Sequence, residues 1–316
     1  MLAIKCIYHC LISLFIFCAV KGHHTHRHKT HNQHHKPEQS PLISTKELRK
    51  VSEEIFDKLP DDIFQYISIN YQGQRDTKDV KDEAPEPLFS VSSDLFEVTP
   101  TIHQMRKLYD NYDINTQHAE IITPKEDMEE NNFIDELLNT SIMIHTMDFL
   151  ASKGYFRKNL NEYRQILKKI WFQPYSRNNH TELGSSGFEH VFLVEKKRSY
   201  ITGLHNWIFF ATAEYDDKAN YLGYIAKEEL ANKAVILKLY LSYMEKVKLS
   251  SMFIGTPPEF EIALYTLCFY ARPNRGCKVL LGNVKVTIQT WVQYSNNAKL
   301  IGSSFPKIYS QTHKYL

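Results

Sequence analysis

The hydrophobic pattern of the chain changes character near its middle, and this change constrains the fold more than any other feature. In the first half, apolar residues recur three or four positions apart, as in Leu48, Val51, Ile55 and Leu59, which is the spacing of an amphipathic helix. In the second half, short runs rich in aromatic and branched residues alternate with polar breaks, which is typical of strands. We therefore expect an α+β protein, with a mainly helical N-terminal lobe packed on antiparallel sheets that carry a groove.

The expected elements follow from this pattern and from helix start signals. A strong helix start lies at Thr123, where a capping threonine precedes Pro124 and early acids, and a helix or helix pair should run on to Gly154. Other helices are expected over residues 44–59, from near 101, over 160–171 and from Thr256. Strands are predicted over residues 188–195, 201–213, 221–226, 234–244, 251–255, 279–281, 284–294 and 300–303.

The N-terminus has the features of a secretory signal. A basic start at Lys5 is followed by a short apolar run and then by Gly22, which predicts a signal peptide over residues 1–22. No later segment is long enough to cross a bilayer, so a secreted protein with no membrane segment in its mature form is expected. The formal charge of +2 over 316 residues is too small to indicate a polyanion partner by itself.

Residues 23–42 are rich in histidine and have almost no apolar side chains, so they predict a disordered segment. Three interpretations of this segment stay open: weak binding of metal ions such as Zn²⁺ or Cu²⁺, acid-dependent attachment to anionic surfaces, or a solvated leader. The folded domain is expected over residues 43–316, with a helical lobe over 43–172 and a β-rich lobe over 173–316.

Outside the signal, only Cys268 and Cys277 remain, and they can either form a disulfide in an oxidising compartment or stay a buried free pair. Two N-x-[ST] sequons, at Asn139 and Asn179, predict glycosylation along the same route.

Two histidines, His190 and His205, each follow a glycine closely and lie in apolar, aromatic runs. Histidine titrates near neutral pH, so such a pair can supply a general base and a general acid. The alternative is that each merely satisfies a hydrogen bond in the core, and spacing alone does not decide between the two.

Several stretches resemble one family, the EndoU-type (XendoU, placental protein 11-like) endoribonucleases, in the family's order and from about Thr45 onward. They are Leu88-Phe89, Asp110-Asn111-Tyr112, Trp171-Phe172-Gln173-Pro174-Tyr175-Ser176-Arg177, Ser186-Gly187-Phe188-Glu189-His190-Val191-Phe192, Gly203-Leu204-His205-Asn206-Trp207, Ile254-Gly255-Thr256-Pro257-Pro258-Glu259-Phe260 and Leu264-Tyr265-Thr266-Leu267-Cys268-Phe269.

The resemblance implies an endonuclease that cleaves single-stranded or loop RNA at uridines, with Mn²⁺ as a frequent cofactor. The products would be a 2′,3′-cyclic phosphate and a 5′-hydroxyl. The family's two catalytic histidines correspond to His190 and His205, one removing the 2′-hydroxyl proton and the other protonating the leaving oxygen. Which histidine is the base stays open, and a monomer is favoured.

The family's third catalytic group is a lysine that stabilises charge on the phosphate. Relatives often carry Lys-Pro here, whereas this chain has Lys246 and Lys248 without the proline. In a strand the two lysines share a face, and we prefer Lys248 with Lys246 as the alternative. Both can also be simply solvated lysines.

Other correspondences are softer. Glu189 and Glu195 match acidic positions of the family that orient an imidazole or contact a metal, and strand alternation would put both on the face opposite His190. Ser251 matches a hydroxyl that reads the uracil edge, and Phe305 stands where tyrosine is usual, so it keeps a stacking face but no phenol. A catalytically weak or inactive member that binds RNA or protein is the alternative function.

Overall fold

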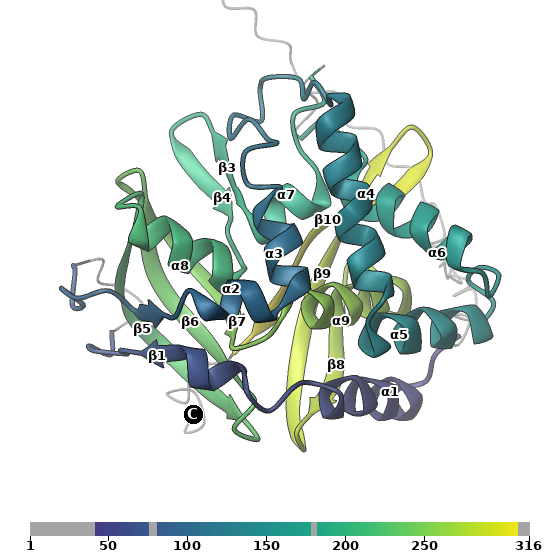
Figure 1. Ribbon diagram of the computed structural model, residues 1–316, viewed down its shortest axis with the longest axis horizontal. Coiled ribbons are helices and arrows are strands. Elements are labelled where there is room, and N and C mark those ends of the chain that lie inside the picture. The colour runs from purple at the N-terminus through teal and green to yellow at the C-terminus, as the bar shows by residue number, and fades with distance from the viewer. Residues whose placement is uncertain (1–41, 76–80, 178–181, 309–316) are drawn as a thin grey trace, which may run out of the picture. The chain divides into compact units, whose positions relative to one another are not determined.

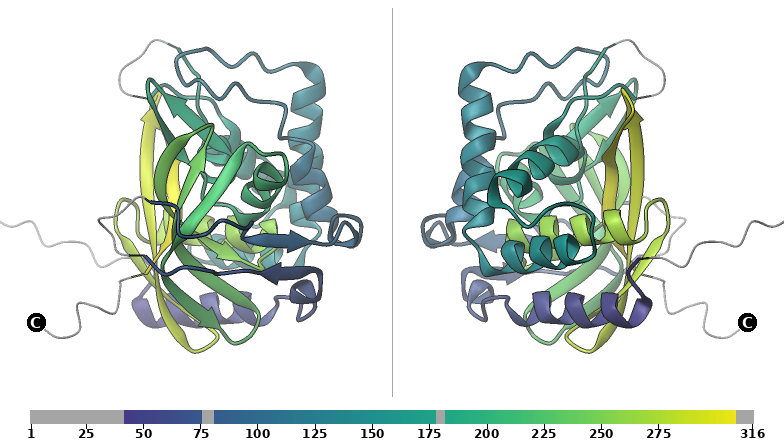
Figure 2. Two further views of the ribbon diagram at one scale, coloured as in Figure 1. Left: turned by 90° about the vertical axis from the view of Figure 1, so that its left-hand side faces the viewer. Right: turned by 90° about the vertical axis from the view of Figure 1, so that its right-hand side faces the viewer.

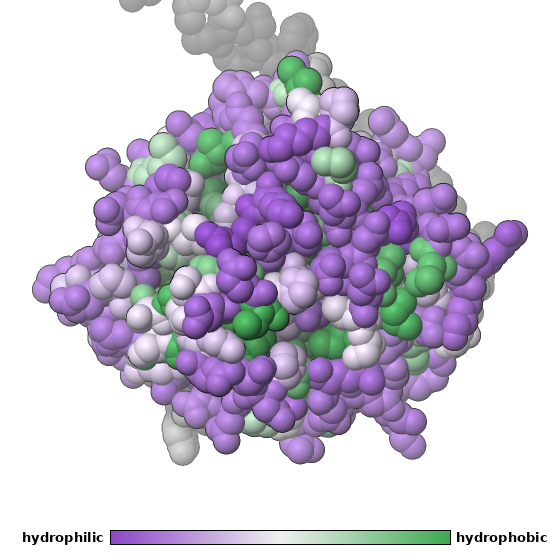
Figure 3. Space-filling view, in the orientation of Figure 1, coloured by the Kyte–Doolittle hydropathy of each residue, from purple (hydrophilic) through white to green (hydrophobic). Residues whose placement is uncertain are grey.

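The computed structural model describes residues 42–75, 81–177 and 182–308, which fall within one unit, Pro41–Leu316 (Figure 1). The predicted signal peptide, all but the last residue of the histidine-rich segment, and the sequon at Asn179 lie outside the described residues. Within them, no helix combines the length and apolar character that a bilayer crossing requires. The visible face is mostly hydrophilic, with small scattered apolar patches (Figure 3).

The first half is mainly helical, as predicted. Its elements are α1 (Thr45–Asp57), a 3₁₀ turn (Ile63–Tyr66), the short paired strands β1 (Ile67–Ile69) and β2 (Phe89–Val91), α2 (Asp94–Val98), α3 (Pro100–Arg106), α4 (Pro124–Leu138), α5 (Ser141–Ser152) and α6 (Leu160–Leu167), which continues into a π-helical turn (Lys168–Phe172). The predicted start at Thr123 is confirmed, because its side chain accepts a hydrogen bond from the backbone of Glu126 in a capping box.

Two three-stranded antiparallel meanders form most of the second half. One consists of β5 (Ala219–Leu230), β6 (Ala234–Tyr243) and β7 (Lys246–Ile254), and the other of β8 (Gly276–Leu281), β9 (Val284–Ser295) and β10 (Ala298–Lys307). A separate hairpin pairs β3 (Val194–Lys197) with β4 (Tyr200–Gly203). The predicted α+β class is confirmed.

Two of the predicted strands are wrong. Residues 188–195 form mostly the helix α7 (Gly187–Phe192), and most of residues 201–213 belongs to β4 and the helix α8 (Trp207–Tyr215). Every residue of α7 is buried, and most of α8 is too, so no polar stripe reveals the helical period. The helix starts are Ser186 and Asn206, whose side chains cap α7 and α8.

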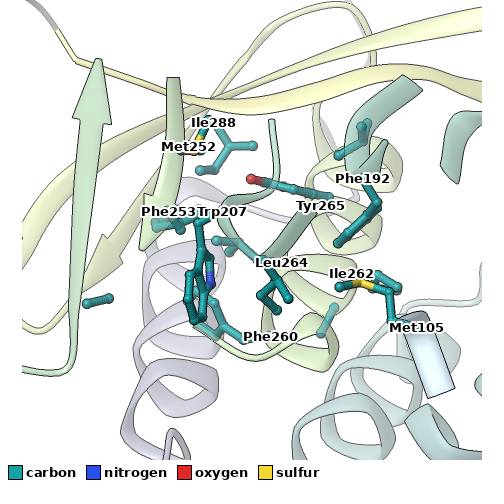
Figure 4. Packing of buried hydrophobic residues seen from close by; sticks show 14 of the residues in the cluster. Met105, Phe192, Trp207, Met252, Phe253, Phe260, Ile262, Leu264, Tyr265 and Ile288 are labelled. Carbon is teal, nitrogen blue, oxygen red and sulfur yellow. The ribbon is translucent and has the colours of Figure 1, made fainter. Parts of the chain in front are cut away.

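A shared core supports the site from behind. Helix α9 (Pro258–Ala271) is buried along almost its whole length, and Figure 4 shows Phe260, Leu264 and Tyr265 packed with Trp207 and Phe253. The indole nitrogen of Trp207 donates to the carbonyl of Thr256 at 2.8 Å. The segment after His205 is therefore anchored to the start of α9.

Peripheral contacts tie the first helix to the second sheet. Helix α1 lies across the lower end of the yellow-green strands in both side views of Figure 2. The hydroxyl of Ser52 bonds both the backbone nitrogen and the carbonyl of Leu280 in β8 at 3.0 Å. At the far end of α9, Cys268 and Cys277 form a disulfide across a Cα separation of 5.6 Å, which resolves the alternatives left open by the sequence.

Candidate active site

The two histidines converge because the chain between them folds back onto α7. The backbone nitrogens of Leu204 and His205 donate to the carbonyls of His190 and Val191, at 3.1 and 2.9 Å. Gly203 permits this approach, since its φ is +74° and a Cβ there would lie 2.1 Å from the carbonyl oxygen of His190. The imidazole centroids are consequently 6.1 Å apart, and both side chains are largely buried.

Glu195 is the polar centre on the His190 side. Its carboxylate is fully buried and lies 2.6 Å from Nδ1 of His190, and it also accepts hydrogen bonds from Nε of Arg177 at 3.2 Å, from the Thr202 hydroxyl at 3.1 Å and from the Ser185 hydroxyl. Burial acts to raise the pKa of Glu195, but His190 and Arg177 outweigh it and lower the pKa to about 2.

This carboxylate fixes the tautomer of His190. An ionised glutamate only accepts hydrogen bonds, so we assign the proton of the neutral imidazole to Nδ1, which leaves Nε2 as an acceptor. Burial, reinforced by the charge of Arg177, lowers the pKa of His190, so the ring is neutral at pH 7. A neutral imidazole with a free Nε2 can remove a proton.

His205 has different surroundings. Its Nδ1 lies 3.1 Å from the carbonyl oxygen of Ser251 and 3.2 Å from the hydroxyl of Ser250, and its ring stacks on Phe305 with centroids 4.6 Å apart. Burial, together with the charge of Lys248, holds its pKa well below the usual range. No carboxylate contacts this ring among the described residues.

The structure brings Lys248, not Lys246, to the histidines. Nζ of Lys248 donates to the hydroxyl of Ser250 at 3.2 Å, and that hydroxyl in turn donates to the carbonyl of Leu204 at 2.7 Å. Burial lowers the pKa of Lys248 to about 7. Lys246 lies two positions earlier in β7, as predicted, but its side chain is exposed.

The strand-based placement of the acids is wrong for Glu195. Because residues 187–192 are helical, alternation does not apply, and Glu195 contacts His190 directly instead of lying on the opposite face. Glu189 is buried, and neither of its carboxylate oxygens has a hydrogen-bond partner in the described part of the chain. Burial, with repulsion from Glu195, raises its pKa well above the usual value.

Sequence reasoning missed three partners of Glu195, namely Arg177, Ser185 and Thr202. Arg177 also donates to the carbonyl of Gly302 at 2.8 Å, so it links the site to β10. Arg177 stood inside one of the resembling stretches, which was the one available signal for it.

The residues predicted to contact the base lie on the His205 side. Ser251 and Phe305 line a pocket of about 300 Å³ that also includes His205, and the hydroxyl of Ser251 donates to the carbonyl of Pro306. Of the predicted sequons, Asn139 is exposed at the C-terminal end of α4. Across residues 42–75, 81–177 and 182–308, no group of three or more His, Cys, Asp or Glu side chains could hold a metal ion.

Comparison with known proteins agrees with this fold. The sequence model of the family Endoribonuclease XendoU matches residues 47–306. The uridylate-specific endoribonuclease of Bos taurus is 34% identical over 283 residues, covering 87% of this chain and 68% of that protein. Uridylate-specific endoribonuclease D of Xenopus laevis is 37% identical over 251 residues, covering 77% and 82%.

Among solved structures, that of XendoU, described as a splicing-independent snoRNA-processing endoribonuclease, superimposes with a TM-score of 0.70. It is 32% identical, and the match covers 85% of this chain and 98% of that one. The chain therefore belongs to the XendoU endoribonuclease family.

Proposed function

We propose that this protein is an endoribonuclease that cleaves RNA at uridines by attack of the 2′-hydroxyl on the neighbouring phosphate. The observation that supports it most is the pair of imidazoles 6.1 Å apart, one held by a buried carboxylate and the other beside a lysine that has no carboxylate partner among the described residues. Two proton-transfer groups and one cation are what this reaction requires.

In the proposed mechanism His190 is the base. Its Nε2 takes the proton of the 2′-hydroxyl, and Glu195 stabilises the imidazolium that forms. The 2′-oxygen bonds to phosphorus while the bond from phosphorus to the 5′-oxygen breaks, which gives a 2′,3′-cyclic phosphate.

His205 is the acid in this scheme. A bound phosphate anion raises the pKa of an adjacent imidazole, so the protonated ring can donate to the departing 5′-oxygen and give a 5′-hydroxyl. Lys248 offsets the charge that grows on the phosphate oxygens.

The test is cleavage of a short RNA that contains a single uridine. We expect His190→Ala and His205→Ala each to abolish cleavage with circular dichroism unchanged, and the wild-type product to carry a cyclic phosphate detectable by mass spectrometry. RNA binding without any cleavage by the wild-type protein would instead support the inactive, RNA-binding member. Cleavage of single-cytidine and single-uridine RNAs at equal rates would contradict the uridine preference.

A dependence on Mn²⁺ is also proposed, and its support is the family resemblance alone. The described residues offer no three-ligand cluster for a protein-bound ion. No step of the mechanism is therefore assigned to the metal. Cleavage rates with EDTA and with increasing Mn²⁺ test the dependence, and equal rates in both would contradict it.

We also propose that the protein is secreted and glycosylated. The disulfide between Cys268 and Cys277 supports an oxidising compartment, and the exposure of Asn139 supports modification there. Expression in secretory cells with and without residues 1–22, followed by glycosidase treatment of the medium, tests both. Deletion of residues 23–36 tests the proposed weak metal binding of the histidine-rich segment.

A further inference from the structure

A cationic pocket lies beside His205, and it contains positively charged groups that binding of a neutral uracil does not require. Its volume is about 300 Å³, and one part of its wall is apolar, formed by Leu249, Phe305 and Ile308. That part suits the face of a neutral base, because stacking on an aromatic ring requires no charge.

Two lysines, Lys238 and Lys307, line the same pocket. They come from different sheets: Lys238 lies on β6 directly opposite Ser251 of β7, and Lys307 is the last residue of β10. Nζ of Lys307 donates to the side-chain oxygen of Gln289 at 2.7 Å, which is a neutral partner.

These two lysines have no carboxylate within ion-pair distance in the described protein. None of the described residues that line the pocket carries a carboxylate, and neither lysine forms an ion pair within the described ranges. Lys248, in its protonated form, adds a third positive charge beside the same histidine. Neighbouring cations repel one another, so the arrangement favours an anionic ligand.

A nucleotide chain offers two anions close to one ribose. In the proposed mechanism, the 3′-phosphate of the uridine lies at His190, His205 and Lys248, and the base occupies the apolar wall. The 5′-phosphate of the same nucleotide is then the anion left for the two lysines.

We propose that Lys238 and Lys307 bind the phosphate on the 5′ side of the cleaved uridine, an inference that rests on the proposed function. This site requires a uridine that is linked through phosphate on both sides. It therefore favours cleavage inside an RNA strand over cleavage after an unphosphorylated 5′-terminal uridine.

The experiment compares two forms of the dinucleotide UpA that differ only in charge at the 5′ position. One carries a methyl phosphodiester with one negative charge, and the other carries the neutral methylphosphonate ester of the same shape. For the wild-type protein we expect kcat/KM to be on the order of tenfold higher with the charged substrate, as for hydrogen bonds to a charged group. In the Lys238→Gln, Lys307→Gln double variant this ratio should fall to about one.

A matched control removes two other lysines. Lys227 on β5 pairs with Leu237 of β6, the residue that precedes Lys238. Lys299 lies near the opposite end of β10 from Lys307. Both lysines are exposed, and neither lines the pocket. The Lys227→Gln, Lys299→Gln variant should keep the tenfold ratio. Loss of the ratio in both variants would indicate a general charge effect and would overturn the proposal.

Other outcomes are equally decisive. A wild-type ratio of one, or a tenfold ratio kept in the Lys238→Gln, Lys307→Gln variant, would overturn the site, as would a changed preference for uridine over cytidine with the ratio intact. Binding of the matching 2′-deoxyuridine compounds, which lack the attacking hydroxyl, gives the same comparison without catalysis. A tenfold affinity ratio in a protein that cleaves nothing would overturn the nuclease mechanism and keep the phosphate site.

Discussion

Each of the two histidines has a buried glutamate nearby, and the surroundings of these two glutamates differ. On the His190 side, Glu195 contacts the ring and Arg177, and these two partners lower its pKa to about 2. On the His205 side, Glu261 reaches the neighbouring Asn206 at 3.2 Å and the hydroxyl of Thr256 at 2.9 Å, and burial raises its pKa to about 8.

The difference shows how identical side chains acquire different protonation states in one protein core. Both glutamates are fully buried, so both lose hydration. Glu195 pairs with the cation Arg177 and is ionised, whereas the hydrogen-bond partners of Glu261 among the described residues are neutral and its carboxyl is protonated at pH 7. His190 therefore stands against an anion and His205 does not, which supports the assignment of base and acid.

The largest effect is expected from Glu195→Gln. The amide is neutral, so it neither stabilises the imidazolium of His190 nor pairs with Arg177. We expect kcat to fall on the order of 10³-fold, as for carboxylates that orient a catalytic histidine. Single-turnover cleavage measures the loss, with thermal melting as the control for folding. A variant within tenfold of wild type would show that His190 does not need its anion.

Glu261→Gln tests the protonation of Glu261 through the pH dependence of the free energy of unfolding. A pKa raised from 4.5 to about 8 means that the folded state holds a proton that the unfolded state loses. This stabilisation is complete below pH 4.5 and is lost as pH rises through 8, by roughly 3 to 5 kcal/mol in total. Glutamine mimics the protonated acid and does not titrate.

The measurement is urea unfolding at pH 5 and pH 9. The wild-type protein should lose free energy of unfolding between the two, and Glu261→Gln should lose less. Equal losses would mean that Glu261 is ionised in the fold, so the two glutamates would not differ.

Lys248 tests the cationic character of the His205 side. We expect Lys248→Ala to lower kcat on the order of 10²-fold, as for removal of one group that stabilises transition-state charge. Because the pKa of Lys248 is lowered to about 7, the wild-type kcat/KM should decline as pH rises above 7.

Lys248→Arg tests whether deprotonation of Lys248 causes the decline in kcat/KM, since arginine stays charged across the whole pH range of the assay. Its kcat/KM should lack the decline above pH 7 even if its maximum is lower. An unchanged alkaline limb would assign the decline to another group. The same substitutions at Lys246, which is exposed, compare the two lysines that the sequence left open.

The sequence predicted the elements that expose a regular polar face or that begin with a clear start signal. Helix α9 is buried almost throughout, and Thr256 with the two prolines after it was the signal that predicted it. The start of helix α4 was predicted from Thr123 and Pro124. In the long strands of both meanders, apolar and polar residues alternate regularly enough to predict strands. Helices α7 and α8 were not predicted, because burial on nearly all sides removes the polar stripe that distinguishes a helix from a strand. The error then propagated to the predicted position of Glu195.

The site residues themselves came from resemblance, and spacing could not have assembled them. Glu195 gathers donors from three separate segments, at Arg177, Ser185 and Thr202, and only the folded backbone brings these together. The choice of Lys248 over Lys246 likewise depends on Ser250, which links that lysine to the loop of His205.

The smallest effect is expected at Phe305, which stacks on His205 with an interplanar angle of 16°. Phe305→Ala removes a stacking surface worth about 1 to 3 kcal/mol per base, so KM should rise roughly tenfold. Phe305→Tyr keeps the ring and should keep KM near that of wild type. If Phe305→Ala instead lowers kcat and leaves KM unchanged, the ring positions His205 and does not bind the base. The aromatic wall of the pocket would then support the catalytic acid and make no contribution to substrate binding.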